Sequence, residues 1–481
     1  MMYLRATILI LSICFYNMVL GQLSVSSLFS DNMVLQRNDT VKIWGTSDKS
    51  VKLEASWLSS SIESKPDKQG KWRIWLPTTD AGGPYTITIQ AKETMTIENV
   101  MLGEVWLCTG QSNMEMPLRG FMGQPVKGSN SEIINSTNSL IRHINIPRKS
   151  TTIPNPTFEA KWEEASPATS GEFSATAYFF AKQIHEITGL PIGIINVTYG
   201  GSNAEAWMNK ASLEAFAGIE VPLNDEAIGE KNRTPTVLYN GMLNPVIGYT
   251  VAGAIWYQGE SNVGKPIEYE TLFPAMVKLW RDQWGQGEFP FYYTQIAPFN
   301  YNSFYPESNP WFANSAYLRD AQRKAQYTIP KSGMISLLDA GEMFNIHPMD
   351  KKTPGERLAW IALNKSYGYE GFGFETPDFD ALNIQDTLVT VTFKQLPNGL
   401  SSLGKEVTAF QIAGADKIFY PAQCNVRRKT VQIWSSKVKA PVAVRYAFTN
   451  EGPAQLFSTE GIPISSFRTD DWNPEAVNTK K

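Results

Sequence analysis

The sequence contains only three histidines, so each can be weighed in turn as a general base. His185 lies near the end of a helical segment, where an imidazole ordinarily pairs with terminal carbonyl groups, and His143 lies in an alternating strand. His347 differs, because it follows a strand-like run (residues 333–339) and a polar turn. In parallel α/β sheets, catalytic residues gather at the carboxyl ends of the strands. We therefore predict His347 as the general base and structural roles for the other two.

Ser112 is the candidate nucleophile. It follows a strand-like run (residues 104–109) and Gly110, which permits a tight turn. Nucleophilic serines stand on such sharp turns between a strand and a helix, where backbone N–H groups converge. Capping a helix is the ordinary role of serine at this junction, so the segment alone leaves both roles open. The G-x-S-x-G elbow of α/β-hydrolases is absent around Ser112.

Two further turns follow strand-like runs at the same expected edge. Gly200 and Gly201 come after residues 192–198, and paired glycines let a backbone N–H approach a ligand closely. The second turn carries the side-chain amides of Gln258 and Asn262, which are suited to donate to a developing oxyanion. Each turn alone is commonplace. Three such turns and one loop histidine at one sheet edge favour an active site.

These residues need a scaffold of parallel strands, and the middle of the chain has that pattern. Strand-like runs alternate with helical stretches, the runs at residues 104–109, 192–198, 251–257, 291–297 and 333–339 and the helices at residues 174–188, 270–282, 316–328 and 353–366. This order predicts a parallel sheet with helices on both faces. Short alternating runs on either side predict β-domains. We expect a signal peptide at 1–21, an N-terminal β-sandwich-like domain at 22–98, an α/β domain at 99–372 and a C-terminal β-domain at 373–481.

The composition excludes several classes of partner. A net charge of -3 gives no basic field for nucleic acid. Residues 1–21 combine a basic start, a short apolar core and a small-residue cleavage site, which predicts export to the periplasm or the extracellular space. The apolar run is too short to span a bilayer, so no span is expected in the mature chain. Only Cys108 and Cys424 would then remain, so we expect neither a disulfide framework nor a metal site.

The motifs resemble those of the sialate O-acetylesterase family within the SGNH-type hydrolases. They are residues 109–114 (TGQSNM), 199–207 (YGGSNAEAW), 256–262 (WYQGESN), 346–348 (IHP), 410–416 (FQIAGAD) and 467–472 (FRTDDW). The resemblance implies a flavodoxin-like three-layer α/β/α domain between two β-domains, no cofactor, and hydrolysis of O-acetyl esters on sugars. O-acetylated sialic acid is the substrate that it favours.

The resemblance also implies roles for single residues. Ser112 would be the nucleophile and His347 the base of an acyl-enzyme mechanism. The N–H groups of Ser112 and Gly201 and the side chain of Gln258 would form the oxyanion hole, with Asn262 as a second candidate donor. The substrate-binding residues expected from the same motifs are Gln111, Trp207, Tyr257 and Glu260, with core packing an equal alternative for the two aromatic residues.

One position departs from the pattern. The wider group often has an aspartate three residues before the histidine, where this chain has Phe344. Asp339 and Glu342 are the nearest candidates for a third triad member. We expect instead that His347 works in a dyad or with a backbone carbonyl at its Nδ1.

Other functions stay open from sequence. Acetylated xylan or another acetylated glycan is an alternative substrate. A glycosidase would use a carboxylate pair from Glu260, Glu342, Asp339 and Asp320, but would leave His347 and the turn at Ser112 without a role. A non-catalytic sugar-binding protein is an alternative of another class. Acetate release separates these functions.

Overall fold

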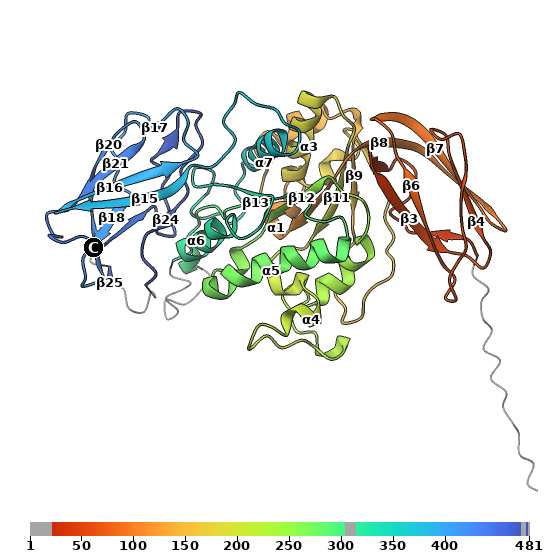
Figure 1. Ribbon diagram of the computed structural model, residues 1–481, viewed down its shortest axis with the longest axis horizontal. Coiled ribbons are helices and arrows are strands. Elements are labelled where there is room, and N and C mark those ends of the chain that lie inside the picture. The colour runs from red at the N-terminus through yellow and green to blue at the C-terminus, as the bar shows by residue number, and fades with distance from the viewer. Residues whose placement is uncertain (1–21, 304–313, 473–477, 480–481) are drawn as a thin grey trace, which may run out of the picture.

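The structure is a computed structural model that describes residues 22–303, 314–472 and 478–479. The predicted signal peptide lies outside these residues. The molecule is elongated, with an α/β unit in the middle and a β-rich unit at each end (Figure 1). Among the described residues, no helix is both long enough and apolar enough to cross a membrane.

The N-terminal unit consists mainly of antiparallel strands, and β2 (Val34–Gln36) pairs in parallel with β8 (Thr94–Gly110). In β6 (Lys71–Pro77), Trp72, Ile74 and Leu76 are buried while their neighbours are exposed, which is the period-two pattern of a half-buried strand. The other strands of this unit are β1 (Ser24–Val25), β2 (Val34–Gln36), β3 (Thr40–Thr46), β4 (Val51–Ala55), β5 (Ile62–Ser64) and β7 (Gly82–Gln90).

The long strand β8 (Thr94–Gly110) joins this unit to the central one. Its first half pairs antiparallel with β7, and its second half pairs in parallel with β11 (Ile192–Thr198) and β12 (Gly253–Tyr257). The boundary expected between residues 98 and 99 therefore falls inside one continuous strand. Ser112 follows the carboxyl end of that strand.

The central sheet has the strand order β10-β9-β11-β8-β12-β13-β14. All of these strands run parallel except β10, which pairs antiparallel with β9. The remaining bounds are β9 (Asn138–Asn145), β10 (Glu163–Ala165), β13 (Phe291–Thr294) and β14 (Ser332–Ile335). The carboxyl ends of β8, β11 and β12 are adjacent, which is the edge predicted to hold the site.

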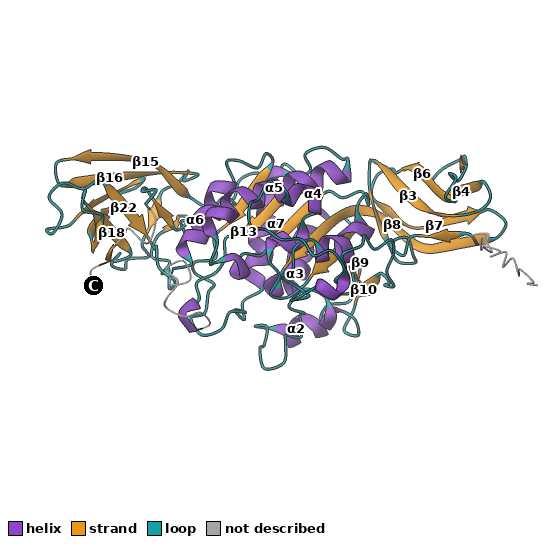
Figure 2. Cartoon of the chain, turned by 90° about the horizontal axis from the view of Figure 1, so that it is seen from below, coloured by secondary structure: helices purple, strands orange, loops and turns teal. Residues whose placement is uncertain are grey.

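Helices cover both faces of this sheet (Figures 1 and 2). Trp106 and Cys108 of β8 pack in one core with α3 (Ala175–Thr188) and α7 (Lys352–Lys365), whereas Val105 and Leu107 pack in another with α5 (Pro266–Trp284). Successive strand residues thus point to opposite apolar layers, which explains why residues 105–108 of β8 are all apolar. The other helices are α1 (Ser112–Glu115), α2 (Ser129–Ile134), α4 (Lys210–Leu213) and α6 (Ala316–Ala325).

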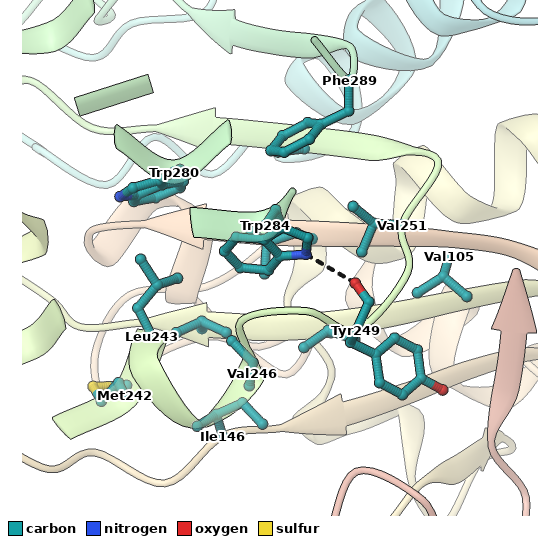
Figure 3. Close-up of a cluster of buried hydrophobic side chains, with 14 of the residues drawn as sticks. Val105, Ile146, Met242, Leu243, Val246, Tyr249, Val251, Trp280, Trp284 and Phe289 are labelled. Atoms are coloured by element: carbon teal, nitrogen blue, oxygen red, sulfur yellow. Dashed lines mark hydrogen bonds between the residues drawn. The ribbon is translucent and has the colours of Figure 1, made fainter. Parts of the chain in front are cut away.

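Tryptophan residues fill the core on the α5 side (Figure 3). Trp280 and Trp284 are buried, and the indole N–H of Trp284 donates to the carbonyl oxygen of Tyr249 at 2.8 Å. Burying aromatic side chains of this size contributes a large part of the apolar free energy of folding. Much of the tryptophan content of the chain is therefore structural.

The C-terminal unit contains two main sheets, which are antiparallel apart from the parallel pair of β19 (Ile418–Pro421) and β25 (Asn478–Thr479), and an apolar core. Its strands are β15 (Asp378–Gln385), β16 (Leu388–Lys394), β17 (Leu400–Ser401), β18 (Phe410–Ala413), β19 (Ile418–Pro421), β20 (Gln423–Val426), β21 (Thr430–Trp434), β22 (Ala443–Tyr446), β23 (Phe457–Ser458), β24 (Phe467–Arg468) and β25 (Asn478–Thr479). Polar contacts attach this unit to the central one. Arg468 forms an ion pair with Asp320 of α6 at 3.1 Å, and Gln295 donates to Ser465 at 2.9 Å.

Candidate active site

Ser112 is the first residue of the short helix α1, directly after β8 (Figure 1). The turn requires glycine: Gly110 has φ 138°, and a Cβ atom there would lie 2.2 Å from the carbonyl oxygen of Tyr257. The N–H of Gln111 donates to the same carbonyl at 3.0 Å. The N–H of Ser112 has no partner within its helix and is available to a ligand.

The turn after β11 lies against Ser112. A Cβ atom on Gly200 would lie 3.5 Å from the Cβ of Ser112, so the two backbones approach closely. The N–H of Gly200 donates to Glu115 Oε2 at 2.8 Å, which fixes the turn. Gly201 has φ 69°, and its N–H makes no hydrogen bond with any described residue. The N–H of Ser112 and the N–H of Gly201, in the turn that packs against Ser112, therefore make no hydrogen bond with the described residues.

His347 lies in the loop before α7 with its Nδ1 atom 2.6 Å from Gln124 Oε1. With the amide assigned this way, Nδ1–H donates to Gln124 and Nε2 is left as the proton acceptor. Burial and the positive charge of Lys351 lower the pKa of His347 to about 4, so the imidazole is neutral at ordinary pH. The ring of Phe121 packs edge-on against it, with 5.4 Å between ring centroids.

Asn113 connects the serine turn to the histidine loop. Its Nδ2 atom donates to the carbonyl of Ile346 at 3.0 Å, and its Oδ1 atom accepts from Lys351 Nζ at 2.7 Å. Lys351 also donates to the carbonyl of Pro348 at 2.8 Å. The carbonyls on both sides of His347 are thus held by hydrogen bonds. No direct hydrogen bond joins Ser112 and His347 in the described residues, as is common in unliganded hydrolases.

Burial of these groups makes their charges interdependent. Lys351 and Glu260 are both almost fully buried, and Asn113 donates to Glu260 Oε1 at 2.5 Å. Burial lowers the pKa of Lys351 to about 7, with Glu260 the largest opposing influence. Burial likewise raises the pKa of Glu260. A cation and an anion therefore compensate each other beneath the serine turn.

Comparison with known proteins assigns residues 102–344 to the family described as carbohydrate esterase, sialic acid-specific acetylesterase. The chain belongs to this family. It is 26% identical over 386 residues to human sialate O-acetylesterase, covering 73% of this chain and 72% of the human protein. The mouse sialate O-acetylesterase is 24% identical over 410 residues, covering 73% and 75%. A crystal structure of a carbohydrate acetylesterase from Xanthomonas citri superimposes with a TM-score of 0.84 and 34% identity, covering 93% of this chain and all of that one.

The structure gives Gln258 a role in this esterase other than the predicted oxyanion donor. Its Nε2 atom donates to the carbonyl of Ser202 at 3.0 Å and to Asn262 Oδ1 at 2.7 Å, so both amide hydrogens are used. Asn262 Oδ1 also accepts from the N–H of Ala204 at 3.0 Å. The two amides are fully buried behind the turn of Gly201, which they support without facing a ligand.

The four predicted substrate-binding residues also lie beneath the surface of the esterase. Trp207 is 0% exposed and donates to Ser202 Oγ at 3.0 Å, and Tyr257 is 1% exposed. Glu260 is bound by Asn113, and Gln111 Oε1 accepts from two backbone N–H groups at 3.3 Å. Neither aromatic ring is able to stack on a sugar, so core packing is their role.

The two carboxylates that were candidates for a third triad member have other partners. Asp339 forms an ion pair with Arg357, with contacts of 2.6 and 2.7 Å. Glu342 accepts from the N–H of Met349 at 2.7 Å. The predicted structural histidines behave as expected. His143 stacks on Phe173 at 4.5 Å, and the Nδ1 atom of His185 lies 2.7 Å from the carbonyl oxygen of Leu190.

Sequence reasoning missed Gln124, Asn113 and Lys351. Asn113 directly follows the predicted nucleophile in the motif of residues 109–114, so its position was a usable signal. Gln124 and Lys351 have none, because an isolated glutamine or lysine in a loop ordinarily lies in solvent. In the described residues, no group of three or more His, Cys, Asp or Glu is arranged to hold a metal ion.

Proposed function

We propose that this esterase removes O-acetyl groups from sugars through an acyl-enzyme on Ser112, with His347 as the general base. The observation that carries the proposal is the meeting of three features at one sheet edge. Ser112 begins the helix that follows the central strand, Gly201 offers an unpaired N–H in the turn that packs against Ser112, and the His347 loop is bound to the residue after Ser112.

The first half of the proposed reaction uses these residues. Nε2 of His347 removes the proton of Ser112 as its Oγ atom attacks the acetyl carbonyl. The N–H groups of Ser112 and Gly201 donate to the oxygen of the tetrahedral intermediate. Each such donor contributes about 2.7 to 4 kcal/mol to transition-state stabilisation in comparable hydrolases. The protonated His347 then gives its proton to the departing sugar oxygen, and water completes the second half.

Gln124 takes the place that a carboxylate has in a Ser-His-Asp triad. A neutral amide oxygen at Nδ1 orients the ring and selects the tautomer. It stabilises the imidazolium less than a carboxylate would, because it carries no net charge. From sequence we expected His347 to work in a dyad or with a backbone carbonyl at its Nδ1 atom. In this proposal the side-chain amide of Gln124 has that place.

The acetylated sugar is proposed to be an O-acetylated sialic acid, because the mammalian relatives are named sialate O-acetylesterases. Another acetylated glycan is the second candidate, since the bacterial relative is named a carbohydrate acetylesterase. Two of the carboxylates considered for a glycosidase form ion pairs: Asp320 pairs with Arg323, and Asp339 pairs with Arg357. Export is proposed from the character of residues 1–21.

Acetate release tests the proposal. Purified protein is assayed on O-acetyl sialic acid and acetylated xylan, with Ser112→Ala beside the exposed control Ser60→Ala. We expect Ser112→Ala to lose turnover while its thermal unfolding is unchanged, and Ser60→Ala to match the wild type. Labelling of Ser202 or Ser261 by an organophosphonate, in place of Ser112, would overturn the assignment.

A further inference from the structure

Two four-residue turns contact His347. In the first, the N–H of Gln124 donates to the carbonyl of Phe121 at 3.0 Å. In the second, the N–H of Asn345 donates to the carbonyl of Glu342 at 3.3 Å. The last residue of each turn also binds His347: Gln124 Oε1 contacts its Nδ1 atom at 2.6 Å, and Asn345 Oδ1 accepts from its backbone N–H at 3.1 Å.

Each turn carries a large apolar side chain at its tip. Met122 is 99% exposed and Phe344 is 90% exposed, and these are the two highest values among the large hydrophobic residues that the structure describes. A single exposed apolar side chain needs no explanation. Here the two most exposed ones belong to two separate turns that both bind His347, which points to a common ligand.

Both turns are held in place by further contacts. Glu342 accepts from the N–H of Met349 at 2.7 Å, and the carbonyl of Met349 accepts from the N–H of Lys127 at 2.9 Å, which links the two loops. Gly120 has φ 86°, and a Cβ atom there would lie 2.5 Å from the carbonyl oxygen of Gln124. Tips carried on fixed backbone bind a ligand with little further loss of conformational entropy.

The proposed reaction indicates which part of the substrate comes close to these two turns. His347 must protonate the departing sugar oxygen, so that oxygen must come within hydrogen-bond distance of the imidazole. The acetyl group points the other way, toward the N–H groups of Ser112 and Gly201. The surface around His347 therefore faces the sugar ring. A pyranose ring exposes C–H groups on its faces, which pack on an aromatic ring or a thioether side chain.

We propose that Phe344 and Met122 form a platform for the sugar ring that bears the O-acetyl group. This inference rests on the proposed function, and it assigns the sugar-contacting side chains that the buried Trp207 and Tyr257 do not supply. Phe344 provides a flat face and Met122 an adaptable one. The platform acts on binding of the sugar and leaves the chemistry of the acetyl ester to Ser112 and His347.

The test compares two substrates that share the acetyl group but differ in the alcohol. Acetate release is measured for O-acetyl sialic acid and for ethyl acetate, whose alcohol has no ring. For Phe344→Ala and Met122→Ala, we expect the KM for the sugar ester to rise about two- to tenfold with little change in kcat. Ethyl acetate hydrolysis should be unchanged. Phe344→Trp should keep the wild-type KM because it retains an aromatic face.

A matched control is Leu403→Ala, which removes an exposed apolar side chain from the C-terminal unit. It should leave both substrates unaffected. Equal loss on both substrates in Phe344→Ala would overturn the platform, because the side chain would then act through His347. Unchanged kinetics with lost vesicle binding or lost self-association would also overturn it, in favour of a membrane or a second copy as the occupant. Failure of the proposed function itself is recognised separately, since Ser112→Ala would then still release acetate.

Discussion

Replacing Gln124 with glutamate would put a carboxylate at the Nδ1 atom of His347, where an amide oxygen now lies 2.6 Å away. The imidazole now has a pKa of about 4, because burial and Lys351 both disfavour its protonated form. A carboxylate at this position favours that form. The pKa of His347 should therefore rise in Gln124→Glu.

The size of the rise follows from the separation of the charges. Two unit charges about 4 Å apart interact by about 4 kcal/mol at an effective dielectric constant of about 20, which corresponds to about 3 pKa units. Burial of the new carboxylate opposes part of this. We expect a net rise of about 1 to 3 units, which moves the pKa of His347 into the range of about 5 to 7.

The pH dependence of kcat/KM for acetate release measures this shift. The neutral imidazole is the active base, so activity falls as the pH drops through the pKa of His347. In the wild type this acidic limb should lie near pH 4, and in Gln124→Glu it should lie at higher pH. The plateau kcat should rise in the variant, because a carboxylate stabilises the imidazolium, and the gain is bounded by the roughly 10⁴-fold effect of the aspartate in a serine-protease triad.

A matched control is Gln69→Glu, which makes the same change of charge at an exposed position in the N-terminal unit. Its acidic limb should coincide with that of the wild type. An acidic limb that does not move in folded Gln124→Glu would refute the reasoning, because Gln124 would then not contact the base. A wild-type limb near pH 6.5 would show that burial and Lys351 do not act on the base as described.

Three further predictions concern other parts of the molecule. Lys351→Met should lower kcat and reduce the free energy of unfolding by about 3 to 5 kcal/mol in urea titrations, because Glu260 would remain as a buried charge without its cation. Trp207→Ala should reduce that free energy by about 3 to 5 kcal/mol, since it opens a cavity in the core, as thermal or urea unfolding would show. Acetate release should be insensitive to EDTA, because three histidines and three cysteines are too few soft ligands to hold a catalytic metal ion. Loss of activity that zinc or calcium restores would contradict this.

The sequence was a sound guide to the elements that carry the site. Alternation of strands and helices in the middle of the chain predicted the sheet, because a strand segment buried on both faces is apolar, as residues 105–108 of β8 are. Gly110 marked the turn at Ser112 for a local reason, because its φ of 138° favours glycine. The expected boundary at residue 98 did not reveal that β8 continues from one sheet into the next, because continuity of a strand leaves no mark in composition.

Roles of side chains within the site were harder to predict. Gln258 and Trp207 lie in the expected motifs, yet both are buried, because the direction of a side chain in a turn depends on packing partners distant in sequence. Gln124 reaches His347 across 223 residues of chain, and no spacing rule connects them. Residue type and local pattern thus located the site but did not separate the residues that face a ligand from those that support it.

The buried Lys351 has two opposing effects on His347. Lys351 opposes protonation of His347, which by itself weakens the base. The same ammonium holds the carbonyl after His347, and Asn113 holds the one before it. Positioning a catalytic group well can lower a barrier by several kcal/mol, and about 7 to 11 kcal/mol in favourable intramolecular reactions. A fixed geometry can therefore offset a base of low pKa, and rate should depend more steeply on the contacts of Asn113 than on the basicity of the imidazole.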